Sequence, residues 1–285
     1  MRYILISLLF VLSVFGFDVE VTSGVVQNGK VTLLELKKEK SISYEDALFN
    51  GKKYKILAHP KKSEKFYLLI PIDYEEKIAK KNIEIFYKEN NKQKSKIVTL
   101  DIKDALYHKE RLQVDGSKIT LNEKDKARSS KEYAEAMKIY NTSTPKTLIS
   151  SKFIVPLESK ITSDFGGARV YNNTLKSYHG GTDFRAAVGT PIVAANDGEV
   201  VLAKDRFYSG MSVLIDHGHG IYTCYFHMSK FDVKEGQKVK KGDVLGLSGD
   251  SGRVSGPHLH FGIRVSGKQV DPLHFIALIN KNLLL

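Results

Sequence analysis

Alternating apolar and polar positions dominate the first half of the chain. Between residues 17 and 125 they form short runs such as KVTLLELK, KFYLLIPI, NIEIFYK and SKIVTLDI, and polar residues separate one run from the next. A period of two residues places the apolar side chains on one face of a strand. The pattern predicts a small antiparallel β domain over residues 17–125. Its two histidines, His59 and His108, are isolated and are expected at surface or packing positions.

A helical segment follows this domain. Residues 123–141 consist mainly of helix formers, with Ser129 and Ser130 as candidate caps, and Pro145 ends the pattern. We expect this part of the chain, residues 126–147, to be a helical linker between two domains.

Glycine punctuates the remaining sequence. From about residue 150, apolar and β-branched runs such as GTPIVAANDGEVVLAKD and MSVLIDHGHGIYTCYFHMS alternate with glycines that permit tight turns and bulges. This pattern of short apolar runs separated by glycines predicts a compact, mostly antiparallel β domain over residues 148–276, followed by a C-terminal tail over residues 277–285. The expected fold class is therefore mainly β.

The amino terminus has the composition of a secretory signal peptide. Residues 1–16 combine one early cation, Arg2, with an apolar run that ends in small residues, and such segments are removed on maturation. The alternative is an uncleaved membrane anchor, although the run is at the short end of the roughly 20 residues that a span needs. The single cysteine, Cys224, cannot form a disulfide within the chain and is expected to be buried on a strand. An exported protein without disulfides suits the bacterial envelope, and we expect it in the periplasm.

The net charge is strongly positive. The chain has 44 Lys and Arg residues against 32 Asp and Glu residues, which gives +12. A basic surface attracts anionic polymers such as nucleic acid or cell wall. No basic motif with interleaved aromatic residues is present, and export argues against nucleic acid as a partner. We interpret the charge as a lysine-rich composition on solvated faces.

Histidines gather in the C-terminal half, where seven of the nine follow residue 178. His179 and Asp183 are four positions apart, His227 ends an apolar run, and His258 and His260 are two apart, so one strand face carries both. Zinc accepts imidazole and carboxylate ligands, and a catalytic zinc needs three of them and an open position. The HExxH pattern is absent, so in a hydrolase a histidine must handle the proton.

Several ordered motifs carry a family resemblance. HGGTDFR, YFHMS and GPHLHFGIRVSGKQVDP occur together with GTPIVAANDGEVV and VKEGQKVKKGDVLGLSGDSG. They resemble the lysostaphin-type zinc peptidases that cut peptidoglycan, over nearly the whole predicted C-terminal domain. The resemblance implies that His179, Asp183 and His260 bind one zinc ion. It implies that His227 and His258 polarise the bound water and stabilise the oxyanion, and it leaves open which of the two is the base.

The same resemblance implies a zinc metalloendopeptidase that cleaves stem-peptide cross-links of peptidoglycan. It favours D,D-endopeptidase activity over cleavage of glycine bridges, and several relatives also act as D,D-carboxypeptidases and influence cell shape. The protein is expected to be a monomer that touches the membrane only through an uncleaved signal segment.

Two further interpretations belong to other classes of protein. Some relatives lose ligands and activate other wall hydrolases without catalysis, but all five positions are intact here. The run VKEGQKVKKGDVLG also resembles biotinyl and lipoyl carrier domains, yet no lysine stands at the expected hairpin tip. The enzyme is the favoured interpretation.

Other residues near the motifs receive weaker expectations. His217 and His219 are expected to be structural or surface residues, and His274 to lie outside the site. The remaining candidates are Tyr178 and Tyr208 for the substrate groove, and Arg169 and Arg185 for a carboxylate of the stem peptide. We also hypothesise that the N-terminal domain, joined through a helical connector, partly covers the groove.

Overall fold

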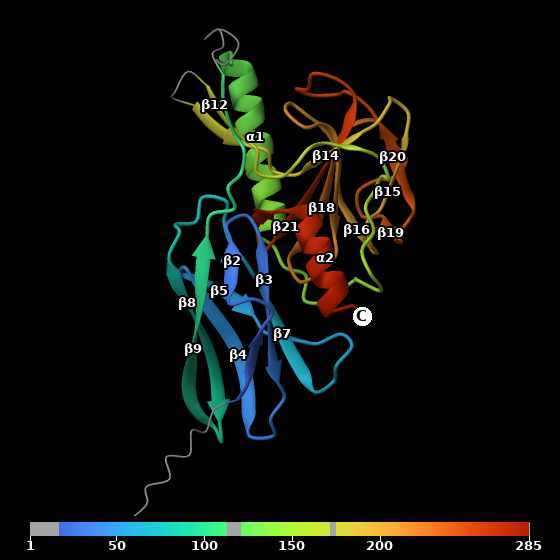
Figure 1. Cartoon of the computed structure of the whole chain (residues 1–285). Coiled ribbons are helices and arrows are strands. Elements are labelled where there is room, and N and C mark those ends of the chain that lie inside the picture. Colours follow the sequence, from blue (N-terminus) through green and yellow to red (C-terminus); the bar gives the residue numbers. More distant parts are fainter. Residues whose placement is uncertain (1–16, 113–120, 172–174, 285) are drawn as a thin grey trace, which may run out of the picture.

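The computed structural model describes residues 17–112, 121–171 and 175–284 (Figure 1). The segment expected to be a signal peptide, residues 1–16, lies outside the described residues. Among the helices that are described, none has the length and apolar character needed to cross a membrane. Strands make up most of the regular structure, which confirms the mainly β fold class.

The N-terminal part consists of two sheets packed face to face. The first sheet contains, in spatial order, β1 (Val19–Val21), β3 (Val31–Lys37), β7 (Lys65–Pro71) and β6 (Leu57–Ala58). The second contains β2 (Val25–Gln27), β9 (Lys92–Lys103), β8 (Lys80–Glu89), β4 (Ile42–Phe49) and β5 (Lys52–Lys55). Alternate apolar residues of both sheets form one buried cluster, as the period of two predicts.

The first of these sheets is also buried on its other face. Val31 and Leu33 of β3, with Tyr67 and Leu69 of β7, belong to the same buried cluster as the core of the C-terminal part. The two parts of the chain therefore share a hydrophobic core rather than meeting only through a linker.

The C-terminal part is built on a ten-stranded sheet. Its main path is β11 (Ile161–Ser163), β14 (Thr182–Arg185), β21 (His258–Val265), β18 (Ile221–Phe231), β17 (Gly210–Asp216), β16 (Gly198–Arg206) and β19 (Lys238–Val239). Three further strands join it, namely β15 (Pro191–Val193), β20 (Val244–Ser248) and β22 (Lys268–Val270). A separate small sheet contains β10 (Lys109–Leu112), β12 (Ala168–Tyr171) and β13 (Leu175–Tyr178).

The predicted helix between the two parts is α1 (Glu123–Tyr140), but the expected caps are wrong. The side chain of Asn122 accepts a hydrogen bond from the backbone N–H of Asp125 and caps the helix. Ser129 lies inside the helix, where its hydroxyl donates to the carbonyl oxygen of Lys126. The helix begins earlier than the serines suggest because Asn122 offers the first side-chain acceptor.

The C-terminal residues form a helix, α2 (Pro272–Asn282), which includes most of the segment expected as a tail. The carboxylate of Asp271 accepts hydrogen bonds from the N–H groups of Leu273 and His274, and Pro272 occupies the first turn. Leu283 and Leu284, which follow the helix, are buried.

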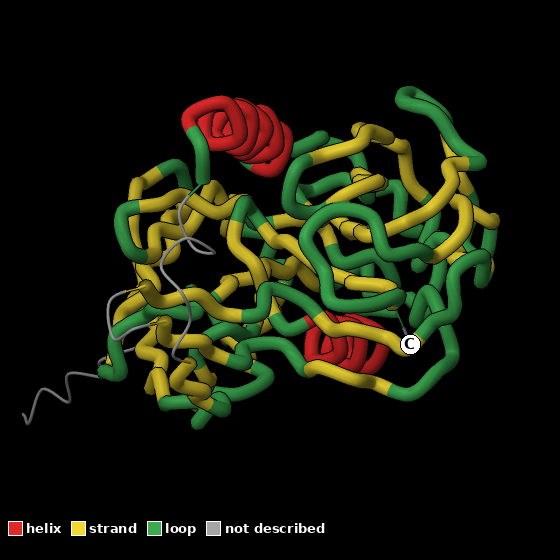
Figure 2. Tube along the Cα trace, turned by 90° about the horizontal axis from the view of Figure 1, so that it is seen from above, coloured by secondary structure: helices red, strands yellow, loops and turns green. Residues whose placement is uncertain are grey.

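The two helices cover opposite faces of the C-terminal sheet (Figure 2). Helix α2 packs on the face formed by residues such as Tyr225 and Phe261. Helix α1 packs on the other face through Ala136 and Tyr140, against alternate strand residues that include Cys224. Cys224 is buried on β18, as expected, and burial raises the pKa of its thiol.

Candidate metal centre

Two of the predicted ligands stand on neighbouring strands at the same level of the sheet. In the antiparallel pair β14 and β21, Asp183 is the direct partner of His260. Asp183 Oδ1 lies 2.9 Å from His260 Nδ1. On β21 the residues Leu259 and Phe261 point into the core, so His258 and His260 share the opposite face.

The third ligand candidate, His179, follows β13 in an irregular segment. Its Nε2 lies 2.9 Å from Asp183 Oδ1 and 3.0 Å from His260 Nδ1. The ligand atoms of these three residues all lie within 4.8 Å of one another, and their side chains are partly buried. The structure therefore brings together the three residues that the sequence motifs predict as ligands.

A short segment of backbone fixes His179. The N–H of His179 donates to the carbonyl oxygen of Gly167 at 2.9 Å, and the N–H of Gly166 donates to the carbonyl oxygen of His179 at 2.8 Å. His179 Nδ1 lies 2.8 Å from the carbonyl oxygen of Asp164. Because a carbonyl oxygen only accepts, the ring proton of neutral His179 is on Nδ1, and the lone pair of Nε2 faces Asp183.

The two glycines after His179 make room for the site. A Cβ atom on Gly181 would lie 2.6 Å from His260 Nε2 and 2.4 Å from the carbonyl oxygen of Phe261. A Cβ on Gly180 would lie 2.2 Å from the side-chain amide of Gln269. Gly181 is therefore a steric requirement of bringing the loop against β21, whereas at Gly180 the flexible end of the Gln269 side chain can move aside.

The donor atoms fit a zinc ion. Their separations of 2.9 to 3.0 Å are somewhat shorter than the roughly 3.4 Å between ligand atoms in a tetrahedral zinc site. The lone pair of His179 Nε2 faces the Asp183 carboxylate at 2.9 Å, and two acceptors at this distance require a cation or a proton between them. Burial raises the pKa of Asp183, but the facing imidazoles of His179 and His260 outweigh it and hold that pKa well below its usual value.

His227 lies beside this group in a strained conformation. It is at a φ of 62°, a left-handed value that is uncommon outside glycine, and it is 8% exposed. Its Nδ1 lies 2.9 Å from the carbonyl oxygen of Ser251, so the ring proton is on Nδ1. Burial lowers the pKa of His227 to about 4, which keeps the ring neutral near pH 7.

His258 has the same arrangement on the neighbouring strand. Its Nδ1 lies 2.8 Å from the carbonyl oxygen of Gly256, which leaves Nε2 without the ring proton. That Nε2 lies 3.7 Å from Asp183 Oδ1, and the rings of His227 and His258 have centroids 4.9 Å apart. The structure thus brings all five predicted site residues together.

Sequence reasoning missed the residues that orient these five. The ring of Phe226 stacks on His260 with 5.3 Å between centroids and 2° between planes. The backbone carbonyl groups of Asp164, Ser251 and Gly256 fix the tautomers of three histidines. Phe226 stands in the quoted motif YFHMS, but backbone acceptors leave no mark in a sequence.

A cavity of about 190 Å³ lies next to His260, between the sheet and helix α1. Its walls include Phe226 and Gly262 from the sheet, Tyr208 from the turn after β16, and Ala136 from the helix. None of its described lining residues comes from the N-terminal β domain. The helical linker, rather than the β domain, therefore bounds this space.

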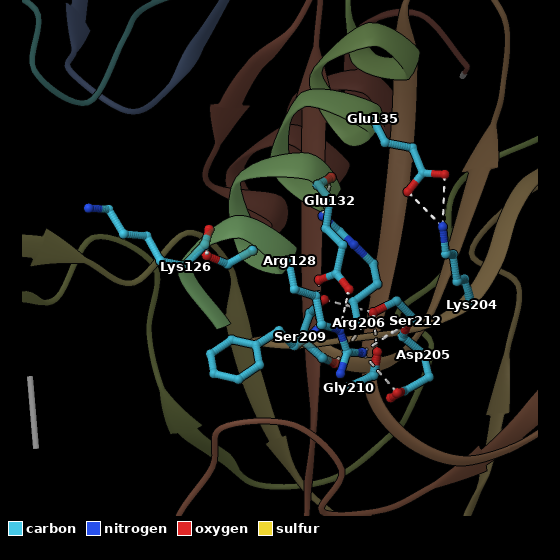
Figure 3. Close-up of polar contacts among 12 residues, drawn as sticks. Lys126, Arg128, Glu132, Glu135, Lys204, Asp205, Arg206, Ser209, Gly210 and Ser212 are labelled. Atoms are coloured by element: carbon cyan, nitrogen blue, oxygen red, sulfur yellow. Dashed lines mark hydrogen bonds and ion pairs between the residues drawn. The ribbon is translucent and has the colours of Figure 1, made fainter. Parts of the chain in front are cut away.

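Helix α1 is fastened beside the cavity by polar contacts (Figure 3). The carboxylate of Glu132 accepts hydrogen bonds from Arg128 Nε at 2.7 Å and from the N–H of Phe207 at 2.8 Å. The Arg206 guanidinium donates to the carbonyl oxygen of Glu132. Glu132 is only 8% exposed, so these contacts replace water around its charge.

The other candidates fall in different places. His217 is fully buried, with its two ring nitrogens near the carbonyl of Asp197 and the hydroxyl of Thr223, and is structural as expected. His219 contacts Tyr67 and the carbonyl of Pro145, away from the site. His274 lies on α2 and is also outside it.

Of the three groove candidates whose side chains are described, Tyr208 alone lines the cavity. Tyr178 stacks on Tyr74 of the N-terminal domain instead. Arg185 is exposed, and its Cα pairs with that of His258 across the sheet. Arg169 belongs to β12, but its side chain is not among those that the structure describes.

Comparisons with known proteins agree on one family. Residues 177–272 match Peptidase family M23. The chain is 44% identical over 121 residues to the peptidoglycan DD-endopeptidase ShyA of Vibrio cholerae, covering 41% of this chain and 28% of that protein. It is 40% identical over 95 residues to the DD-carboxypeptidase/endopeptidase Mpg of Neisseria meningitidis, covering 33% of this chain and 22% of that protein.

A solved structure extends the likeness beyond this segment. A Pseudomonas aeruginosa protein assigned to peptidase M23 aligns with a TM-score of 0.68 and 26% identity, covering 88% of this chain and 95% of that one. The matched part of this chain spans less than a third of the length of these two curated relatives. This chain carries a domain of peptidase family M23, the lysostaphin-type metallopeptidases, which depend on zinc.

Proposed function

We propose that this protein is a zinc-dependent peptidoglycan hydrolase that cleaves stem-peptide cross-links as a D,D-endopeptidase. The observation that carries the proposal is the meeting of His179, Asp183 and His260, with His227 and His258 on the same side of the sheet. The names of the V. cholerae and N. meningitidis relatives support the substrate class. The N. meningitidis name supports D,D-carboxypeptidase activity as a second reaction of the same site.

His179 Nε2, Asp183 Oδ1 and His260 Nδ1 are the proposed ligand atoms. Bound zinc polarises the scissile carbonyl and lowers the pKa of a water molecule towards neutrality. The protein contributes a fixed triangle of donors, because backbone hydrogen bonds orient His179 and the Phe226 ring orients His260.

His227 and His258 are the proposed proton-handling residues. Each donates its Nδ1 proton to a backbone carbonyl, so each has an Nε2 lone pair available for a proton. One of them takes the proton of the attacking water and passes it to the leaving amine. The other stabilises the carbonyl oxygen as negative charge develops on it.

Mass spectrometry of muropeptides tests this proposal. Purified sacculi with direct D-Ala to diaminopimelate cross-links are incubated with the zinc-loaded protein, and sacculi with glycine bridges are treated in parallel. Release of uncross-linked tetrapeptides from the first substrate only is the expected result. Products from the glycine-bridged sacculi would show that the protein cleaves glycine bridges instead of the proposed cross-link. Absence of products from both substrates would favour the non-catalytic activator.

The proposed setting is the bacterial periplasm, where the protein would act as a monomer and influence cell shape. The apolar run of residues 1–16 and the single cysteine support export. Fractionation of cells that express the tagged chain tests the location. Mass analysis of the purified protein by light scattering tests the monomer.

A further inference from the structure

The segment that holds His179 is itself held by the N-terminal β domain. The hydroxyl of Tyr74 donates a hydrogen bond to the carbonyl oxygen of Gly166 at 3.0 Å. The N–H of Ala168 donates to the carbonyl oxygen of His108 at 2.8 Å. From this point β10 runs parallel to β12. Strand β10, which precedes helix α1 in the chain, therefore adds a strand to the small sheet next to the metal site.

Aromatic stacking joins the same two parts of the chain. The ring of Tyr74 lies between two others, with centroids 3.8 Å from Tyr178 at 8° and 5.2 Å from Tyr107 at 21°. Phe165 packs edge-on against all three tyrosines. Tyr178 immediately precedes His179, so this stack fixes the backbone at the proposed ligand.

The backbone of Gly166 lies directly against this stack. It has a φ of 89°, and a Cβ atom there would lie 2.3 Å from the ring of Tyr107. The hydroxyl of Tyr107 donates to the carbonyl oxygen of Asn28, which ties the ring to the N-terminal domain. Only glycine allows so close an approach in this conformation.

These contacts reach His179 from two sides. Gly166 and Gly167 form backbone hydrogen bonds with His179, and Asp164 fixes its ring. Tyr74 touches both the 164–167 segment and the residue before His179. A displacement of Tyr74 would therefore loosen the ligand without touching the metal.

We propose that Tyr74 is a positioning residue for the metal site, and that the N-terminal β domain is a structural part of that site. The inference rests on the proposed function only in taking His179 as a zinc ligand. It assigns the N-terminal domain a role in holding the metal, which differs from covering the groove.

Zinc affinity of full-length variants tests the proposal, measured by competition with a chromogenic chelator. Tyr74→Ala removes the stack and the hydrogen bond, and we expect zinc binding to weaken by about 10-fold or more. Tyr74→Phe keeps the ring and loses only the bond to Gly166, so a smaller loss is expected. Circular dichroism of each variant establishes that the chain is folded.

Tyr44 supplies the matched control. Its hydroxyl also donates to a backbone carbonyl, that of Lys37, and its ring packs edge-on against Phe17 and Phe66 in the N-terminal domain. Tyr44→Ala and Tyr44→Phe are expected to bind zinc as the wild type does. Equal weakening by the Tyr44 and Tyr74 variants would reduce the effect to general destabilisation and overturn the proposal.

A reference variant separates the two proposals. His179→Ala is expected to lose zinc. If His179→Ala binds zinc as tightly as the wild type does, the proposed ligand set fails. If His179→Ala loses zinc while both Tyr74 variants keep wild-type affinity, the ligand set stands and the positioning role of Tyr74 is wrong.

Discussion

His179 Nε2 and His260 Nδ1 lie 3.0 Å apart, although the two histidines are 81 positions apart in the chain. The antiparallel pairing of β14 with β21 sets Asp183 opposite His260, and the bend at Gly181 brings His179 to the same place. The metal centre therefore depends on strand register and on the absence of a side chain at Gly181.

Adding a methyl group to Gly181 is expected to weaken zinc binding about 10-fold or more. The new Cβ would lie 2.6 Å from His260 Nε2 and 2.4 Å from a backbone oxygen that cannot rotate away. Chelator competition measures the change in Gly181→Ala. Gly24→Ala, in the N-terminal domain, is the control, because a Cβ there meets nothing within 4 Å. Wild-type zinc affinity in Gly181→Ala would refute this steric account of the HGG motif.

Removal of the His227 side chain is expected to spare the metal and slow the reaction. His227→Ala should retain zinc while kcat falls by about 10² to 10⁴, the usual contribution of a general acid or base. Metal analysis and muropeptide release are measured on the same preparation. His219→Ala, which alters a histidine away from the site, should leave both unchanged. An unchanged rate in His227→Ala would remove this residue from the proposed mechanism.

The grouping of the five candidate residues could be predicted because their spacing carries information. His258 and His260 share a strand face by the period of two, and the ordered motifs associate them with His179, Asp183 and His227. The residues that orient them could not be predicted. Tyr74 reaches the site through packing between distant parts of the chain, and backbone acceptors such as the Ser251 carbonyl are independent of side-chain identity.

The fold was predictable where the pattern was strong. The runs that gave β8 and β9 alternate clearly, and the helix formers of α1 are continuous. Helix α2 was missed although Asp271 and Pro272 form a good start signal, because the segment after them is short and mostly apolar. The shared core could not be foreseen, since apolar residues on both faces of β3 predict a strand that is buried on both sides but do not show which part of the chain packs on each face.

Burial of His217 predicts that the protein loses stability in mild acid. Burial lowers the pKa of this histidine to about 4, so its neutral form is favoured in the folded state. The contribution of His217 to the free energy of unfolding is fully present above the ordinary pKa of 6.5 and falls as the pH drops towards 4. The loss should reach about 2 kcal/mol at pH 5.

Urea unfolding of the wild type and His217→Gln between pH 7.5 and 5 measures this loss. Other buried histidines titrate in both proteins, so the difference between the two pH profiles isolates His217. The wild-type free energy of unfolding should fall more steeply on acidification. Parallel profiles would show that His217 does not carry the pH dependence.

Loosening helix α1 tests whether the connector restricts the site. Glu132→Ala leaves the N–H of Phe207 without its acceptor, and should lower stability by about 1–3 kcal/mol. Because α1 bounds the cavity beside His260, we expect faster release of muropeptides from intact sacculi. Glu135→Ala, which breaks an exposed ion pair with Lys204, should change neither stability nor rate by much. An unchanged or lower rate in Glu132→Ala would argue against restriction by this helix.

The zinc content of His260→Ala compared with that of His258→Ala tests the central claim most directly. The two histidines stand on the same strand face, yet only His260 has a ring nitrogen within 3.0 Å of both His179 and Asp183. Plasma mass spectrometry after dialysis is predicted to find about one zinc ion per chain in His258→Ala and almost none in His260→Ala. Zinc retained by His260→Ala and lost by His258→Ala would contradict the proposed ligand set.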